Sequence, residues 1–217
     1  PDRMKPGPGF RALAPAGLKI IFALLTHPKT AGAPYREIAK VARVGLGTVG
    51  EVLADLEERG HLTPEKPGPR RLLDADRLME EWVTHYPIKL RPKLVGRRFT
   101  APTADWWRQQ DLRQYHAWWG GEVAAEKLTG YLRPARVTAY VEGKPERLIL
   151  DNRLRPDVNG EIEILQAFWA PDEECEPTDV APPLVVYADL MATSDTRNIE
   201  TAKLIRDRCI ADPHRTG

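Results

Sequence analysis

Acidic side chains gather around one predicted strand in the second half of the chain. In the segment EIEILQAFW, Glu161 and Glu163 alternate with apolar residues, so both carboxylates lie on one face of an extended strand. Asp157 precedes this strand, and Asp151 lies further upstream. Carboxylates that converge on one divalent cation serve metal-assisted hydrolysis. Asp157 and Glu161, with Asp151 as a third candidate, are therefore the residues that could hold such an ion.

The pattern PD…E-I-E around this strand resembles the PD-(D/E)xK pattern of restriction-endonuclease-like folds. In that pattern a strand carries a metal-binding carboxylate, and a lysine two residues further on assists the attacking water. Glu163 stands at the lysine position in this chain, and no nearby histidine replaces the lysine. We therefore expect a degenerate, non-catalytic domain of this kind with no metal and no other cofactor, and we keep a metal-dependent nuclease as the alternative. The sequence contains no Walker loop, GxSxG, HExxH or GxGxxG motif, so we predict that the chain is not an enzyme.

Positive charge is concentrated in the first half of the chain. Residues 1–100 hold 18 Lys and Arg against 11 Asp and Glu, whereas residues 101–217 hold 14 against 20. A basic half is typical of proteins that bind a polyanion, and an acidic half is not. The two halves are therefore expected to do different work, with double-stranded DNA as the partner of the first.

Apolar residues at spacings of three and four predict three helices in the first half, in the segments PAGLKIIFALLTH, PYREIAKVAR and LGTVGEVLADLEER. Leu18, Ile21 and Phe22 belong to the apolar stripe of the first helix, and Val49 belongs to that of the third. Gly60 stands where a glycine commonly ends a helix. These helices form the scaffold that would position a DNA-binding surface.

The stretch IAKVARVGLGTVGEVLADLEERGHL resembles the winged helix-turn-helix family of bacterial regulators. Ala39 falls where that family needs a small residue between the two helices. Thr48, beside Gly47, falls in the first turn of the recognition helix, where side chains and backbone groups meet bases and phosphates. The wing would be a hairpin of residues 61–63 and 70–73 around the loop PEKPGP. The resemblance thus implies DNA contacts by Gly47, Thr48, Lys66, Arg70 and Arg71.

Two positions depart from the family pattern. Arg43 replaces the usual glycine of the turn, and Gly45 replaces the usual Ser or Thr at the N-cap of the recognition helix. The outward face of that helix carries no Lys or Arg before Arg59, so base reading by these residues is not expected. One alternative is that the module mediates protein contacts only.

A basic segment follows the predicted helix DADRLMEEWVTHY, which is expected to close the first domain. Residues 87–103 are interpreted as a basic linker that tracks phosphates or as an edge strand whose charges block aggregation. In an extended conformation, alternate basic residues of this segment project to one side. The basic residues of the segment, all candidate DNA contacts, are Lys89, Arg91, Lys93, Arg97 and Arg98.

The remaining residues predict an α/β domain with a mixed sheet. Residues 104–128, with two Trp-Trp pairs, are expected to be a helix that Gly120-Gly121 breaks or kinks and that Glu122–Leu128 continues. Its tryptophans are expected to form core contacts rather than a base-stacking platform. The segments RVTAYVEG, ERLILD, EIEILQAFW and PPLVVYADL are candidate strands, and RNIETAKLIRDRCI is a helix. The predicted fold class is therefore α+β. A winged helix-turn-helix domain (residues 1–86) and the basic segment precede an α/β domain (residues 104–217), for which a degenerate restriction-endonuclease-like fold is one option.

Three segments in the second half, taken in order, carry a family resemblance: GGEVAAEKLTGYLRPARVTAYVEG, RPDVNGEIEILQAFW and VVYADLMATSDTRNIETAKLIRDRC. They are similar to the AbiEi-type antitoxins of type IV toxin–antitoxin systems. The resemblance implies a transcriptional repressor of its own operon. It also implies an antitoxin that opposes a nucleotidyltransferase-like toxin without forming a stable complex. No catalytic residues come with this family.

The location of the chain is predicted from its apolar runs and its cysteines. No apolar run approaches the roughly 20 residues of a membrane span, so no membrane partner is expected. Residues 1–10 are rich in Pro and Gly and do not resemble a signal peptide. Cys175 and Cys209 lack CxxC spacing, which fits a reducing, cytoplasmic setting.

Overall fold

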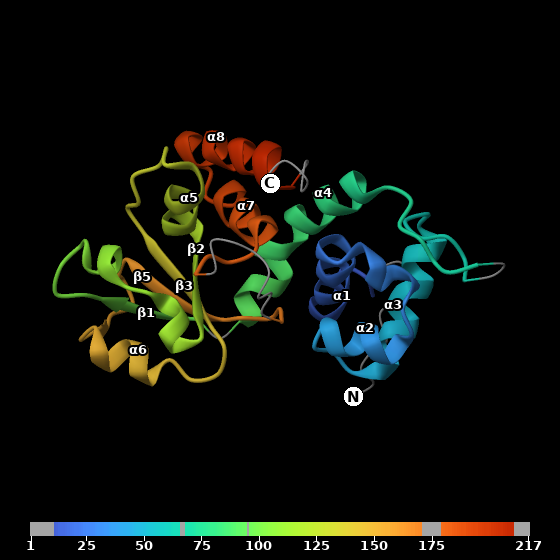
Figure 1. Cartoon of the computed structure of the whole chain (residues 1–217), viewed down its shortest axis with the longest axis horizontal. Helices are drawn as coiled ribbons and strands as arrows, with labels where there is room; N and C mark the ends of the chain where they lie inside the picture. Colours follow the sequence, from blue (N-terminus) through green and yellow to red (C-terminus); the bar gives the residue numbers. More distant parts are fainter. Residues whose placement is uncertain (1–10, 66–67, 95, 171–178, 211–217) are drawn as a thin grey trace, which may run out of the picture. The chain divides into compact units, whose positions relative to one another are not determined.

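The computed structural model describes residues 11–65, 68–94, 96–170 and 179–210. The chain divides into two compact units. Unit 1 comprises Pro1–Lys93 together with Phe168–Pro171, and unit 2 comprises Leu94–Ala167 together with Asp172–Gly217. Helices precede a mixed sheet in chain order, which confirms the predicted α+β class (Figure 1).

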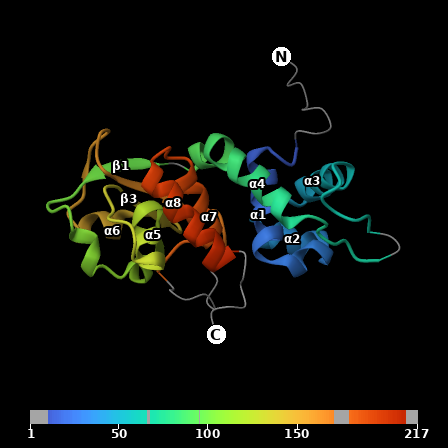
Figure 2. The same ribbon diagram turned by 90° about the horizontal axis from the view of Figure 1, so that it is seen from above.

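Unit 1 is helical, with α1 (Pro15–Thr26), α2 (Tyr35–Val41), α3 (Leu46–Glu58) and α4 (Ala75–His85). The four helices follow one another along the chain as labelled in Figures 1 and 2. The stripes expected for α1 and α3 are buried, as the predicted helices require. The fully or almost fully buried apolar side chains of these helices include Leu18, Ile21, Phe22, Ile38, Val49, Val52, Leu53, Leu56, Leu78 and Trp82.

An aromatic cluster completes the core of unit 1. The rings of Trp82 and Tyr86 stack at 4.7 Å between centroids, and Phe168 meets Phe22 edge-on at 5.0 Å. The Trp82 indole N–H donates to the Leu18 carbonyl at 2.8 Å, so the buried polar group of this tryptophan is satisfied. Phe168 follows the last strand of the sheet in sequence, so the chain contributes to unit 1 from two distant segments.

The segment after α4 is helical where an extended conformation was one expectation. Helical turns cover Tyr86–Leu90 and Arg91–Lys93. Trp82, Tyr86 and Leu90 are all buried, and their four-residue spacing places them on one helical face. Burial of this face holds the segment in helical turns, so the alternation predicted for an extended chain does not apply here.

Unit 2 is built on a five-stranded mixed sheet with the order β2-β3-β5-β1-β4. Strand β3 runs parallel to β5, and the other neighbouring pairs are antiparallel, which confirms the mixed sheet. Strand β1 lies between β5 and β4, so the expectation of an edge strand in this region is wrong. The strands are β1 (Arg97–Thr100), β2 (Ala117–Gly120), β3 (Val137–Val141), β4 (Arg155–Pro156) and β5 (Ile162–Gln166).

The helices of unit 2 lie on both faces of this sheet. Figure 1 shows α5 (Gly121–Thr129) and α8 (Thr196–Ile205) on one side and α6 (Glu146–Asp151) on the other. Every residue of β3 is buried, as expected for a strand covered on both faces. The buried Tyr140 hydroxyl donates at 2.8 Å to Asp189 of α7 (Pro183–Met191) and so ties this helix to the sheet.

Two predicted strands are helices instead. ERLILD forms α6, where Pro145 is the N-cap and Arg147 lies 3.5 Å from Asp151 one helical turn later. PPLVVYADL forms α7, and its residues 184–190 are all buried. An element buried on every side loses the period that distinguishes a helix from a strand, which explains the second error.

The helix predicted over residues 104–128 is wrong before Gly120, whereas its predicted continuation over Glu122–Leu128 is confirmed as part of α5. Two 3₁₀ turns, at Trp106–Gln109 and Leu112–Tyr115, precede β2 and α5. A Cβ at Gly120 would lie 2.4 Å from the Tyr140 ring, so the glycine lets β2 pass close to β3. The expected core role of the tryptophans is confirmed for Trp107 and Trp119, which are 5% and 0% exposed.

Candidate nucleic-acid interface

The turn between α2 and α3 sets the angle at which the two helices meet. The Arg43 N–H donates to the Lys40 carbonyl at 3.2 Å, and the Val44 N–H donates to the Ala39 carbonyl at 3.0 Å. These two bonds form the Schellman motif that commonly ends helices. Arg43 has φ +53°, a left-handed conformation that costs a residue with a side chain about 1 kcal/mol. The structure thus shows why glycine would suit this position.

The N-terminus of α3 is open at Gly45 and Gly47, on either side of the exposed Leu46. Gly45 is its N-cap, and no side chain caps the helix. A Cβ built at Gly45 or Gly47 would meet no atom within 4 Å. Gly47 is exposed and Thr48 is half-buried, with its N–H bonded to the Gly45 carbonyl at 3.1 Å. Another molecule can therefore approach the first backbone N–H groups of α3 closely.

A basic stripe on α2 escaped the sequence analysis. Arg36 and Lys40 lie four residues apart on this helix, and both are exposed, as is Arg43 in the turn that follows. Residues at this spacing share one face of a helix. In helix-turn-helix proteins the first of the two helices crosses the DNA backbone. The four-residue spacing of Arg36 and Lys40 in PYREIAKVAR is the sequence signal for this basic face.

The hairpin predicted for the wing is present in its paired part. Leu62 and Leu72 form an antiparallel bridge, and the Thr63 N–H donates to the Arg71 carbonyl at 2.9 Å. The side chain of Arg71 is exposed, whereas Arg70 is only 4% exposed. Lys66 lies outside the described residues.

Arg70 fastens the hairpin to the chain that enters α2. Its Nε donates to the Ala31 carbonyl at 3.3 Å, and its Nη2 donates to the Ala33 carbonyl at 3.1 Å. Its Nη1 donates to Glu65 at 2.9 Å, and its guanidinium stacks 4.9 Å from the centre of the Tyr35 ring. The donors of this side chain are therefore directed inward, contrary to the prediction that Arg70 faces a phosphate.

A buried histidine lies at the base of the same hairpin. His61 is 0% exposed, and its Nε2 lies 3.2 Å from Glu81 Oε1. Glu81 also pairs with Arg59. Burial lowers the pKa of His61 below its usual 6.5 and outweighs the opposite effect of Glu81. The buried imidazole at the base of the hairpin therefore lies beside the Arg59–Glu81 ion pair.

The five basic residues predicted between positions 89 and 98 are not on one strand. Lys89, Arg91 and Lys93 belong to helical turns of unit 1, whereas Arg97 and Arg98 belong to β1 of unit 2. Lys93 and Arg97 are exposed, and the other three are half-buried. Arg98 lies opposite Glu163 of β5 in the sheet register. The structure therefore divides this predicted basic stretch between two units.

The carboxylates of the nuclease alternative do not converge on one point where a metal ion could bind. Asp157 Oδ1 accepts the Asn159 N–H at 2.9 Å and so stabilises the turn before β5. Asp151 is exposed and pairs with Arg147, and Glu161 is exposed. Within the described ranges, no three or more His, Cys, Asp or Glu side chains are grouped so that they could hold a metal ion. No geometric observation favours the nuclease alternative.

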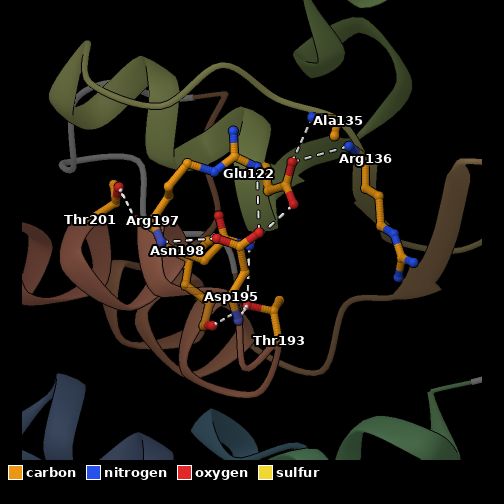
Figure 3. Close-up of polar contacts among 9 residues, drawn as sticks. Glu122, Ala135, Arg136, Thr193, Asp195, Arg197, Asn198 and Thr201 are labelled. Atoms are coloured by element: carbon orange, nitrogen blue, oxygen red, sulfur yellow. Dashed lines mark hydrogen bonds and ion pairs between the residues drawn. The ribbon is translucent and has the colours of Figure 1, made fainter.

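A polar cluster in unit 2 joins α5 to α8 (Figure 3). Glu122 Oε2 accepts the backbone N–H groups of Ala135 and Arg136 at 2.6 and 3.1 Å, and Oε1 accepts the Asn198 amide at 3.1 Å. The Asn198 amide also donates to Thr193 Oγ at 3.1 Å, and Asn198 is only 2% exposed. The carboxylate is therefore an anchor for a loop and a helix, and its hydrogen-bonding capacity is directed into the fold.

In chain order, a helical unit is followed by an α/β unit. A family model described as "Transcriptional regulator, AbiEi antitoxin, Type IV TA system" matches residues 71–211. The chain belongs to this family of transcriptional regulators, the AbiEi antitoxins of type IV toxin–antitoxin systems, as the sequence predicted. No curated protein and no solved structure matches it. In the part of the chain that the structure describes, no helix is long and apolar enough to cross a membrane.

Proposed function

We propose that residues 11–73 of unit 1 form a winged helix-turn-helix that binds double-stranded DNA, and that the chain represses the operon that encodes it. In this proposal α3 is the recognition helix and α2 crosses the backbone. The hairpin around the Leu62–Leu72 bridge is the wing. The chain acts by binding and not by catalysis. Its counterpart is a nucleotidyltransferase-like toxin that it opposes without a stable complex.

The observation that carries the proposal is the arrangement of charge around α3. The exposed basic residues Arg36 and Lys40 lie on α2, and Arg71 lies on the hairpin that follows α3. Between them in the chain, the first turn of α3 offers open backbone N–H groups and no acidic residue. Basic side chains on the elements before and after α3, together with amide donors at the start of α3, suit a phosphate backbone.

The residues assigned to DNA differ in part from those predicted from the sequence. Gly47, Thr48 and Arg71 remain in the proposed surface, Arg36 and Lys40 are added, and Arg70 becomes a structural residue of the wing. Lys93 and Arg97 are exposed and stay predicted phosphate contacts. Lys66, Lys89, Arg91 and Arg98 stay predictions that only binding measurements can test.

The test is a fluorescence-anisotropy titration of the full chain with duplex DNA from the region upstream of its own coding sequence. Wild-type affinity should fall steeply with salt because binding releases counterions. Arg36→Gln, Lys40→Gln and Arg71→Gln should each weaken binding to all sequences and reduce the salt slope by about 1. Lys144→Gln removes one exposed charge from unit 2 and is the control, with no change expected. Absence of duplex binding at about 50 mM salt, where phosphate contacts are strong, would overturn the proposal.

A further inference from the structure

The outward face of α3 begins with an exposed apolar side chain. Leu46, the first residue of the helix, is 47% exposed. Gly50 lies one turn further on the same face, and a Cβ there would lie 3.2 Å from the ring of Tyr35. The Tyr35 side chain is itself 39% exposed. An exposed leucine and an exposed aromatic ring therefore cover neighbouring turns of the proposed recognition helix.

This face contains few groups that could hydrogen-bond to a base edge. Residues 46–58 contain no Lys, Arg, His, Asn or Gln, which are the side chains that read guanine and adenine in the major groove. Glu51 is exposed and pairs with Arg11 at 2.5 Å. Thr48 is the remaining short polar side chain near the helix start, and it is half-buried.

The position of the Tyr35 ring is set by its neighbours. The Arg70 guanidinium stacks on the ring, and the same guanidinium is bonded to the carbonyls of Ala31 and Ala33. On α3, Gly50 leaves room for the ring because it has no side chain. The apolar face is thus built on a fixed support, and the basic residues Arg36, Lys40 and Arg71 suit an anionic partner.

We propose that α3 recognises thymine, and that Leu46 packs against the C5 methyl group of a thymine in the major groove. This inference rests on the proposed DNA binding and specifies its chemistry. Apolar side chains discriminate thymine by this methyl group, the one apolar feature among the base edges of that groove. Arg36, Lys40 and Arg71 hold the phosphates on either side, and the helix selects DNA with thymine at the position of Leu46.

The test replaces thymine by deoxyuridine in the upstream duplex, because this change removes the methyl group and keeps every hydrogen-bonding group of the base. The full-length wild type should bind the thymine duplex about fourfold more tightly for each methyl group buried. Leu46→Ala should bind the two duplexes equally, whereas Leu46→Met should keep the preference. Ile88→Ala, which truncates another exposed apolar side chain of unit 1, is the matched control and should keep it too.

The outcomes separate this inference from the proposed function. If the wild type binds both duplexes tightly and equally, thymine recognition is refuted while DNA binding stands. If neither duplex is bound at low salt, the proposed function itself fails. If Leu46→Ala keeps the thymine preference, Leu46 is not the reader. If that variant instead converts a dimer into a monomer in sedimentation velocity with the preference intact, the face is a contact between two copies of the chain and the assignment is overturned.

Discussion

Arg70 and Arg71 are neighbours in the sequence with opposite surroundings, so they form a matched pair for mutation. The Arg70 side chain is buried and bonded to the carbonyls of Ala31 and Ala33, whereas the Arg71 side chain is exposed. A hydrogen bond from a charged donor contributes roughly 1.5–3 kcal/mol, and the contact with the Tyr35 ring adds about 0.5–1 kcal/mol. The contributions of bonds made by one side chain are not additive, so the total is smaller than their sum. The bond to Glu65 contributes little because that carboxylate side chain is 63% exposed. We expect Arg70→Ala to destabilise unit 1 by about 2–4 kcal/mol, and Arg71→Ala to change stability by less than about 0.5 kcal/mol.

Hydrogen-exchange mass spectrometry on the full chain is the suitable measurement, because it reports unit 1 separately from unit 2. Amides of α2 and of the Leu62–Leu72 hairpin should lose protection in Arg70→Ala and keep it in Arg71→Ala. Arg70→Lys retains the charge but cannot reach two carbonyls at once, so its protection should lie between those of wild type and Arg70→Ala. Arg71→Ala should weaken DNA binding although its fold is intact, because it removes an exposed charge of the proposed surface. Equal protection in the two alanine variants would refute the structural role of Arg70.

Three further predictions concern other parts of the fold. Glu122→Gln places an amide against N–H donors and should lower the stability of unit 2 by about 1–2 kcal/mol, measured by urea unfolding. His61 binds a proton less readily in the folded than in the unfolded chain, because burial lowers its pKa. The stability of unit 1 should therefore fall as the pH drops below 6.5, and His61→Gln should flatten this dependence. A pH profile that is the same in the variant and the wild type would contradict this prediction. A Cβ at Gly160 would lie 2.1 Å from the Phe99 carbonyl oxygen, so Gly160→Ala should cost about 1–3 kcal/mol in thermal unfolding, whereas Gly68→Ala, with open space around it, should cost nothing measurable.

The sequence predicted elements well where burial is one-sided. Helices α3 and α4 each bury one face and expose the other, so the period of the apolar residues identifies the element. Gly60 has φ +73°, as expected for the glycine that ends α3. Where both faces are buried, as in α7, the period disappears and the type of element cannot be deduced from the pattern.

The candidate site shows a different limit. Both Arg70 and Arg71 were predicted to contact DNA because they are basic residues at the base of a loop. The side chain of Arg70 turns inward because the carbonyls before α2 and the Tyr35 ring lie within its reach. Those partners are more than 30 residues away in the sequence, so no local pattern could have distinguished the two arginines. By contrast, the stripe of Arg36 and Lys40 follows from helical spacing alone and was predictable.

The chain crosses between the two units more than once, so a truncated fragment cannot be used to assign a function to unit 1. The chain leaves unit 1 after Lys93 and returns to it at Phe168–Pro171. Phe168 is 2% exposed, meets Phe22 at 5.0 Å and lies 6.5 Å from the Trp82 ring, so it is part of the core of unit 1. A fragment cut after the predicted boundary at residue 86 would lack this ring and expose its neighbours, at a cost of several kcal/mol by analogy with removal of a buried phenylalanine. Loss of DNA binding in such a fragment would then report unfolding. The family match spans residues 71–211 and so includes the returning segment as well as most of unit 2. Point variants in the full chain, such as Arg71→Gln in unit 1 with Lys144→Gln in unit 2 as its control, are therefore the sound way to test the proposed operator binding.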